Sequence, residues 1–187
     1  MVNQTAQLPP APLQTDTPLW QFSVKLWGNP RSADAALALQ AQGWVVSHLL
    51  VAAFSAQQGR VWDGREPETI KAWRQEATMN LRSLRRFLPK SRPDLSDLRQ
   101  RLAQAELEAE RIELAWWSLH LQQQPLPSTR PQGALALLAD NLAAAAEPSA
   151  QTVELLADFA SELIPAATRE ALTEALQARA GYADEQK

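Results

Sequence analysis

PDLSDLRQRLAQAELEAERIELAWWSLHLQQ, which runs from Pro93 to Gln123, is the longest helical pattern in this chain. It contains no Gly, and no Pro after its first residue, and a helix of about 30 residues is roughly 45 Å long. Its apolar residues alternate spacings of three and four, as in a helix that packs along a neighbour. These residues are Leu95, Leu98, Leu102, Ala105, Ala109, Ile112, Trp116 and Leu119. The stretch therefore predicts a long helix at the centre of the fold.

A second amphipathic helix is predicted immediately before it, from Pro67 to about Leu88. Its apolar and basic residues fall on roughly opposite arcs of a helical wheel. The apolar arc holds Ile70, Trp73, Ala77, Leu81, Leu84 and Leu88. Because only the short segment Pro89–Arg92 separates the two helices, we expect them to form a long antiparallel hairpin.

Gly, Pro and capping residues divide the remaining sequence into shorter helices. The expected helices are Pro18–Trp27 with Thr17 as its cap, Ala33–Gln42 with Ser32 as its cap, Trp44–Gln58, Gln132–Ala146, a helix from Ser149 to about Ile164, and one from Pro165 to about Gly181. No stretch alternates as a strand does, so the predicted class is all-α, a bundle of seven to eight helices around the central hairpin. The expected domains are a disordered tail at 1–17, a helical bundle at 18–147, and a C-terminal helical extension at 148–187 that docks on the bundle.

The composition of the 187-residue chain excludes several functional classes. It contains no cysteine, which rules out disulfides, thiol nucleophiles and Cys-ligated zinc. The longest apolar run, Trp44–Phe54, is shorter than the ~20 residues that a membrane span requires. Without cysteines or a recognisable signal peptide, we expect a cytoplasmic protein with no membrane span.

An acidic stripe lies on the long helix between two apolar arcs. It consists of Glu106, Glu110 and Glu113. A metal or acid–base site is one interpretation, but the Glu-x-x-His pairs of di-iron bundles are absent. Ion pairing is preferred, because partly buried carboxylates are normally paired. The expected hairpin register sets Arg74 across from Glu106 and Glu110. It sets Lys71 across from Glu113.

The histidines and tryptophans offer weaker candidates for a site. His48 and His120 sit among apolar neighbours, so a structural role is favoured over catalysis. The tryptophans are Trp20, Trp27, Trp44, Trp62, Trp73, Trp116 and Trp117. A ligand groove lined by them is possible, but core packing is the default for such residues. We therefore predict no catalytic residue, cofactor or metal site, and an enzyme ranks last among the functions considered.

A basic cluster at the loop end of the hairpin is the sharpest functional signal. It contains Arg82, Arg85, Arg86, Lys90, Arg92, Arg99 and Arg101. Only Asp94 and Asp97 oppose these residues at that end. Clustered like charges raise the local potential and attract an anionic partner, although a solvated helix end is the alternative interpretation.

The expected function is therefore a non-enzymatic interaction or regulatory protein that binds an anionic protein surface through this cluster. Residues 149–187, which are acidic, are another candidate to neutralise it. A nucleic-acid-binding accessory protein is the alternative function. The net charge of −3 and the lack of interleaved exposed aromatic residues make that alternative less favourable. The sequence does not specify an oligomeric state.

Four stretches carry a family resemblance. They are LWQFSVKLWGNP (Leu19–Pro30), LQAQGWVVSHLLV (Leu39–Val51), IKAWRQEATMNLRSLRR (Ile70–Arg86) and QAELEAERIEL (Gln104–Leu114). Over roughly residues 19–142 the chain resembles an uncharacterised bacterial family of small all-helical proteins, a domain of unknown function. The resemblance implies an all-helical fold and brings no reaction, cofactor or catalytic residue with it.

Overall fold

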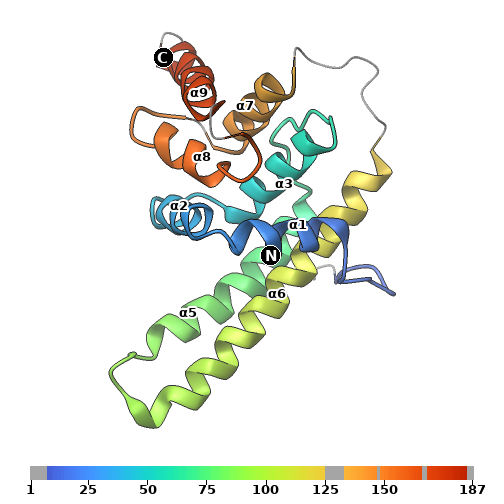
Figure 1. Cartoon of the computed structure of the whole chain (residues 1–187). Helices are drawn as coiled ribbons and strands as arrows, with labels where there is room; N and C mark the ends of the chain where they lie inside the picture. Colours follow the sequence, from blue (N-terminus) through green and yellow to red (C-terminus); the bar gives the residue numbers. More distant parts are fainter. Residues whose placement is uncertain (1–7, 125–132, 147, 166–167, 185–187) are drawn as a thin grey trace. The chain divides into compact units, whose positions relative to one another are not determined.

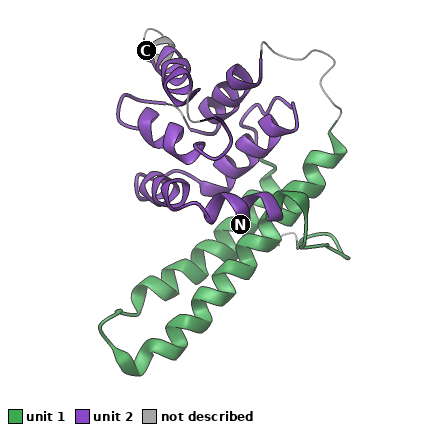
Figure 2. Cartoon of the chain, viewed as in Figure 1, with its two compact units in different colours: residues 1–20, 66–124 green, residues 21–65, 125–187 purple. Residues whose placement is uncertain are grey.

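The computed structural model of this chain describes residues 8–124, 133–146, 148–165 and 168–184 (Figure 1). Within these ranges the regular elements are helices and no strand occurs, which confirms the predicted all-α class. The chain divides into two compact units, residues 1–20 with 66–124 and residues 21–65 with 125–187 (Figure 2). This division differs from the expected boundary at residue 147, because the hairpin forms a unit separate from the helices before and after it.

The first unit is built on the helical hairpin. Its first arm consists of α4 (Glu68–Trp73), a π-helical segment η1 (Arg74–Thr78) and α5 (Met79–Phe87). Its second arm consists of a short 3-10 turn η2 (Pro93–Leu95) and the long helix α6 (Ser96–Gln123). The two arms pack against each other along their length, and Figure 1 shows α5 and α6 side by side. The predicted long helix and hairpin are both present.

Apolar packing holds the two arms together around α4. Ile70 and Trp117 are fully buried. The indole Nε1–H of Trp73 donates to the backbone carbonyl of Ala109 at 3.0 Å, which ties α4 to α6. An indole in such a half-buried position needs a partner for its N–H, and the α6 backbone supplies it.

The segment before the first helix contacts this unit. The Oγ1 of Thr17 accepts a 3.1 Å hydrogen bond from the backbone N–H of Trp20, so Thr17 caps α1 (Pro18–Trp27) as predicted. Arg111 donates to the carbonyl of Thr15 at 3.3 Å, and its guanidinium lies 5.3 Å from the centre of the Trp20 ring. Residues 1–7 of the expected disordered tail lie outside the described residues. Residues 8–17 are non-helical, and these contacts give their last part defined partners.

The second unit is assembled from helices on both sides of the hairpin in sequence. Its helices after α1 are α2 (Pro30–Ala41), α3 (Val46–Gln57), α7 (Ala134–Ala145), α8 (Val153–Phe159) and α9 (Arg169–Asp184). Helix α3 packs on α7, α2 packs on α8, and α9 packs on both α7 and α8. The helices after residue 148 are therefore integral to this unit.

Several helix boundaries differ from the predicted ones. Helix α2 begins at Pro30 because Asn29, rather than Ser32, is its cap, with Oδ1 accepting from the N–H of Ser32 at 3.1 Å. Helix α8 ends at Phe159 rather than near Ile164. Both shifts are a few residues long and leave the order of the elements unchanged.

Asn141 of α7 fixes the loop that follows α3. Its Oδ1 accepts from the N–H of Trp62 at 2.9 Å, and its Nδ2 donates to the carbonyls of Ala52 at 3.1 Å and Arg60 at 2.9 Å. Asn141 is fully buried, so these bonds satisfy a side chain that would otherwise be costly to bury.

The same loop approaches α7 closely at Gly64. This residue has φ +78°, and a Cβ atom there would lie 2.6 Å from the carbonyl oxygen of Ala144. Only glycine satisfies both the left-handed conformation and the close approach.

Candidate functional site

The π-helical segment in the first arm determines which side chains face α6. The N–H of Met79 bonds to the carbonyl of Arg74, five residues back. A π turn holds one residue more than an α turn. That extra residue rotates every later position by about 100° relative to an uninterrupted α-helix. The apolar and basic faces were predicted for an uninterrupted α-helix. They therefore hold before the π segment and fail after it.

The rotation turns part of the predicted basic face of α5 toward α6 and exposes part of the predicted apolar face. Ile70, before the segment, is fully buried as predicted. Leu84 was predicted to face the core, but it is 54% exposed, and Phe87 is 81% exposed. Arg82 and Arg85 face α6 instead, and none of the residues of α5 is buried. The distal half of the hairpin thus has two arginines on its inner side and exposes Leu84 and Phe87, whereas Leu81 and Leu88 stay half-buried.

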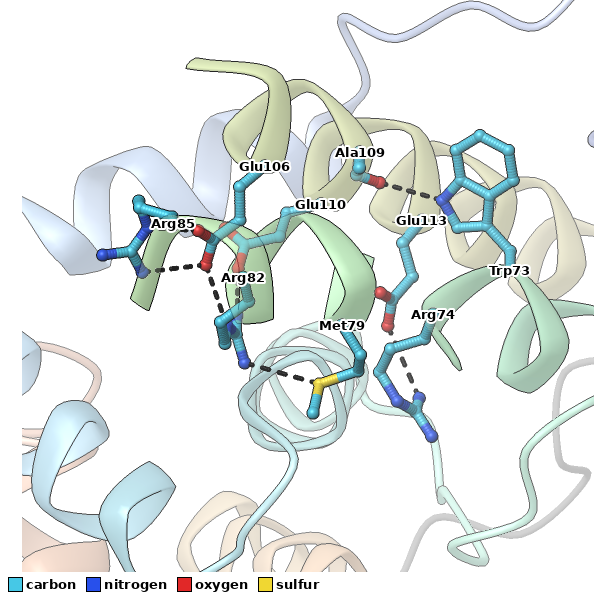
Figure 3. Close-up of polar contacts among 9 residues, drawn as sticks. All are labelled: Trp73, Arg74, Met79, Arg82, Arg85, Glu106, Ala109, Glu110 and Glu113. Atoms are coloured by element: carbon cyan, nitrogen blue, oxygen red, sulfur yellow. Dashed lines mark hydrogen bonds and ion pairs between the residues drawn. The ribbon is translucent and has the colours of Figure 1, made fainter. Parts of the chain in front are cut away.

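Together, Arg82 and Arg85 bind Glu106 and Glu110, the first two carboxylates of the acidic stripe (Figure 3). The Nε of Arg82 donates to Glu106 Oε1 at 2.8 Å, and its Nη2 donates to Glu110 Oε1. Arg85 donates to both oxygens of Glu106, from Nη2 to Oε1 at 3.1 Å. The side chains of Arg82 and Glu106 are only 13% and 8% exposed. The prediction that Arg74 pairs with Glu106 and Glu110 was therefore wrong.

The remaining predicted pairs also have different partners. Arg74 binds Glu66, with Nη2 to Oε2 at 2.7 Å, and lies 3.5 Å from Oε1 of Glu113. Lys71, which was predicted to face Glu113, pairs with Glu68 at 3.5 Å on the surface.

The register of the hairpin is close to the predicted one. The midpoint between Phe87, where α5 ends, and Ser96, where α6 begins, lies beside Ser91. Trp73 bonds to Ala109, which lies equally far beyond Ser91. The partners of Glu106 and Glu110 differ because the π segment changes the face that α5 presents to α6.

The two carboxylates that share Arg82 have opposite pKa shifts. Burial is the largest single influence on Glu106 and would raise its pKa, but the hydrogen bonds and charges of Arg85 and Arg82 together hold that pKa below the ordinary value. Burial raises the pKa of Glu110; the charge of Arg82 opposes this shift and the neighbouring charge of Glu106 adds to it. We call these ion pairs between the two arms the ionic seam. Within it, Glu106 is therefore firmly ionised, whereas Glu110 is easier to protonate.

Four of the seven predicted partner-binding residues are engaged within the hairpin. Arg82 and Arg85 belong to the seam described above. Arg99 donates from Nη1 to the carbonyl of Leu88 at 2.6 Å and to that of Arg85, so it caps the end of α5. Arg92 pairs with Asp94, its Nε donating to Oδ1 at 2.8 Å, and both side chains are 58% exposed.

The other three members of the cluster are exposed. Arg86, Lys90 and Arg101 form no ion pair with another described residue. Arg86 and Lys90 lie at the end of α5 and just after it, and Arg101 lies in the second turn of α6. We call these three residues the free cations of the hairpin end.

Neither histidine adjoins a set of groups that suggests catalysis. The ring of His48 packs edge-on against Trp62 with centroids 5.6 Å apart. The ring of His120 packs similarly against Trp117 at 5.9 Å, and its Nε2 lies 2.9 Å from the amide nitrogen of Gln124. Among the described residues, no group of three or more His, Asp or Glu side chains is arranged to hold a metal ion.

Sequence reasoning missed the apolar half of this surface. Phe87 and Met79 are both outside the predicted apolar arc, and they are 81% and 42% exposed on α5. Because these two apolar residues fall outside the predicted arc, the sequence already indicated that the helix carries apolar side chains on more than one face.

The fold and the site define an all-helical protein whose hairpin has an ionic inner seam and a basic, partly apolar outer end. Residues 18–116, slightly more than half of the chain, match the sequence model of a family described as a protein of unknown function (DUF2390), and the chain belongs to that family. The resemblance inferred from the sequence is confirmed, although the match ends before residue 142. No curated protein and no solved structure matches the chain significantly. None of the helices in the described ranges has the length and apolarity needed to cross a membrane.

Proposed function

We propose that this protein is a non-enzymatic interaction or regulatory protein that binds an anionic surface of a partner protein through the free cations of the hairpin end. The observation that carries the proposal is that Arg86, Lys90 and Arg101 are exposed and have no ion pair among the described residues. Cations gathered without counter-charges raise the local potential and favour an anionic partner. We place this activity in the cytoplasm, in keeping with the absence of cysteine.

Contacts within the hairpin leave fewer basic residues available to a partner than the sequence suggested. Arg82 and Arg85 are occupied by Glu106, and Arg99 is occupied by backbone carbonyls. Exchanging these residues would disturb the hairpin itself. Arg92 is exposed and paired only with its neighbour Asp94, so it can rearrange toward a partner at little cost.

The ionic seam supports a non-enzymatic role. Glu106 and Glu110 are bound by Arg82, and Glu113 lies beside Arg74. Carboxylates held in this way serve the packing of two helices and are poorly placed to exchange protons with a substrate.

The second candidate is nucleic-acid binding by the same cations. Exposed Phe87 follows Arg86 directly, and an aromatic ring beside a cation is the pairing that binds single-stranded nucleic acid by stacking. The two functions differ in salt dependence, because phosphate contacts release counterions and weaken steeply as salt rises.

The test uses a variant with Arg86→Glu, Lys90→Glu and Arg101→Glu, which leaves the inner seam intact. The control variant carries Lys25→Glu, Arg65→Glu and Lys71→Glu, which change the net charge equally at other sites. Tagged full-length protein is used for partner capture. We expect the hairpin-end variant, and not the control, to lose its captured partners. Capture that is the same for both variants contradicts the proposal.

Binding of a labelled single-stranded RNA and DNA at low and high salt separates the two candidates. Retention that disappears in the hairpin-end variant and falls steeply with salt favours the nucleic-acid function. Absence of retention by the wild-type protein at low salt eliminates it.

A further inference from the structure

The outward face of α5 carries exposed apolar side chains, of which Met79 also contacts Arg82 through its Sδ atom. Met79, Leu84 and Phe87 are 42%, 54% and 81% exposed. The opposite side of α5 is committed to Arg82 and Arg85, which bind the carboxylates of α6. Burying such side chains against a partner is favourable, because it removes apolar surface from water.

The two ends of this face carry opposite charges. Glu76 lies in the π segment at the start of the face, and Arg86 and Lys90 lie at its end. All three residues are exposed and form no ion pair with another described residue. Exposed Asn80 and Ser83 lie between them, and Ser83 is small enough to allow another helix to approach closely.

We propose that the protein self-associates by packing this face of α5 against the same face of a second copy, antiparallel and about a two-fold axis near Ser83. In a two-fold interface, each residue that lies before the axis meets the residue equally far beyond it in the other copy. Met79 of one copy then meets Phe87 of the other. Glu76 meets Lys90 of the other copy, so the apolar centre is closed at both ends by opposite charges.

Charge favours a second copy over other occupants of the face. An anionic protein or nucleic acid that is laid along it would meet Glu76 at one end. A parallel arrangement of two copies would set Glu76 against Glu76 and Lys90 against Lys90, which is repulsive. Only the antiparallel pairing satisfies both ends with the residues of this face.

The contact is small, so the association is weak and concentration-dependent. Three apolar side chains from a helix of nine residues bury less than the roughly 800 Å² per partner of a standard interface. The inference goes beyond the proposed function, because Arg101 lies on α6, outside this contact, and Phe87 is not one of the free cations. The two proposals can therefore fail separately.

Sedimentation equilibrium of the full chain from about 10 μM to about 1 mM measures the association. The expected mass rises with concentration from 20.7 kDa toward that of a dimer. Phe87→Glu should keep the mass at the monomer value across the range. The matched control is Leu107→Glu on α6, where Leu107 is 49% exposed, and it should associate like the wild type. Circular dichroism checks that each variant keeps its helices, and Phe87→Ser replaces Phe87→Glu if the latter unfolds.

Charge reversal tests the antiparallel register. Glu76→Lys and Lys90→Glu should each weaken association, and the double variant should restore it, because the pair is then reversed. A monomer mass at every concentration overturns the proposal, as does equal loss in the Phe87 and Leu107 variants. Failure of the double variant to recover overturns the register. Arg101→Glu, which should leave the mass unchanged, reports on the proposed partner binding alone.

Discussion

Arg82 and Glu106 form a largely buried ion pair between the two arms of the hairpin, with Nε donating to Oε1 at 2.8 Å. The pair lies beyond the π segment, where an uninterrupted helix would have presented leucine. It therefore links a local change of helix geometry to the way in which the distal hairpin is held together.

Removing one member of this pair should destabilise the protein. In Arg82→Met, Glu110 loses its arginine and Glu106 keeps only Arg85. Breaking a buried pair costs about 3–5 kcal/mol, and because Arg85 remains we expect a loss of roughly 2–3 kcal/mol. Urea denaturation measures the free energy of unfolding. Arg92→Met, which breaks an exposed pair, is the control and should leave that free energy nearly unchanged. Equal effects of the two substitutions would refute the assigned role of the seam.

Deleting one residue from the π segment should remove the π turn without turning α5. Gln75 is exposed, and its deletion allows continuous α-helical hydrogen bonding. Because the π turn accommodates one extra residue, Arg82 and Arg85 keep the same face after the deletion and still reach Glu106. We expect a smaller loss of unfolding free energy, measured by urea denaturation, than in Arg82→Met.

A second substitution makes that prediction specific. Glu106→Leu should be destabilising both in the protein that lacks Gln75 and in the wild-type background, because Arg82 and Arg85 face position 106 in both. Deletion of Ser91 in the connection is the control for chain shortening. If Glu106→Leu stabilises the protein that lacks Gln75, the deletion has turned α5 and the assigned face is wrong.

Glu106 and Glu110 should give opposite pH dependences of stability. The folded pKa of Glu106 is lowered, so its stabilising effect is present above the ordinary glutamate pKa of about 4.5 and is lost as the pH falls toward the lower folded value. The folded pKa of Glu110 is raised by burial, so the folded state binds more protons than the unfolded state above pH 4.5. Stability should therefore increase as the pH falls through that window.

Unfolding free energies of Glu106→Gln and Glu110→Gln between neutral pH and acidic pH test this contrast. Relative to its glutamine variant, the wild type should lose advantage on acidification at position 106 and gain it at position 110. Parallel profiles for the two positions would contradict the assigned shifts.

Asn141 should be essential to the second unit. Asn141→Ala removes three buried hydrogen bonds, one from the N–H of Trp62 and two to the carbonyls of Ala52 and Arg60. A buried polar group left unsatisfied costs about 1–3 kcal/mol, so we expect a loss of roughly 3 kcal/mol in unfolding free energy. Asn141→Asp should not rescue it, because it loses the donor and buries a charge. Asn80→Ala on the exposed face of α5 is the control, and a comparable loss there would argue against a special role for Asn141.

Local signals in the sequence predicted the helices well. Thr17 followed by Pro18 marks the start of α1, and the unbroken pattern after Pro93 marks α6, because capping and periodicity act over a few residues. The hairpin followed from two long helices with a short connection. Ion pairing of the acidic stripe could be predicted because its carboxylates lie between two apolar arcs.

The contacts that depend on distant residues could not be predicted in the same way. A π turn has no distinctive composition, so nothing in residues 74–78 indicated that Arg82 would face α6. Asn141 binds residues about eighty positions earlier in the chain, and nothing local indicates its partners. The division into two units depends on packing between segments on either side of the hairpin, which helical periodicity does not report.

The extra residue of the π segment also affects how members of this family should be compared. A relative that lacks it would place its inward-facing residues one position earlier relative to α4. An ungapped alignment would then match its buried positions with exposed ones throughout α5, and equivalent arginines would look like unrelated substitutions. Allowing a single-residue gap within 74–78 restores the correspondence, because relatives with and without that residue then present the same face of α5 to α6.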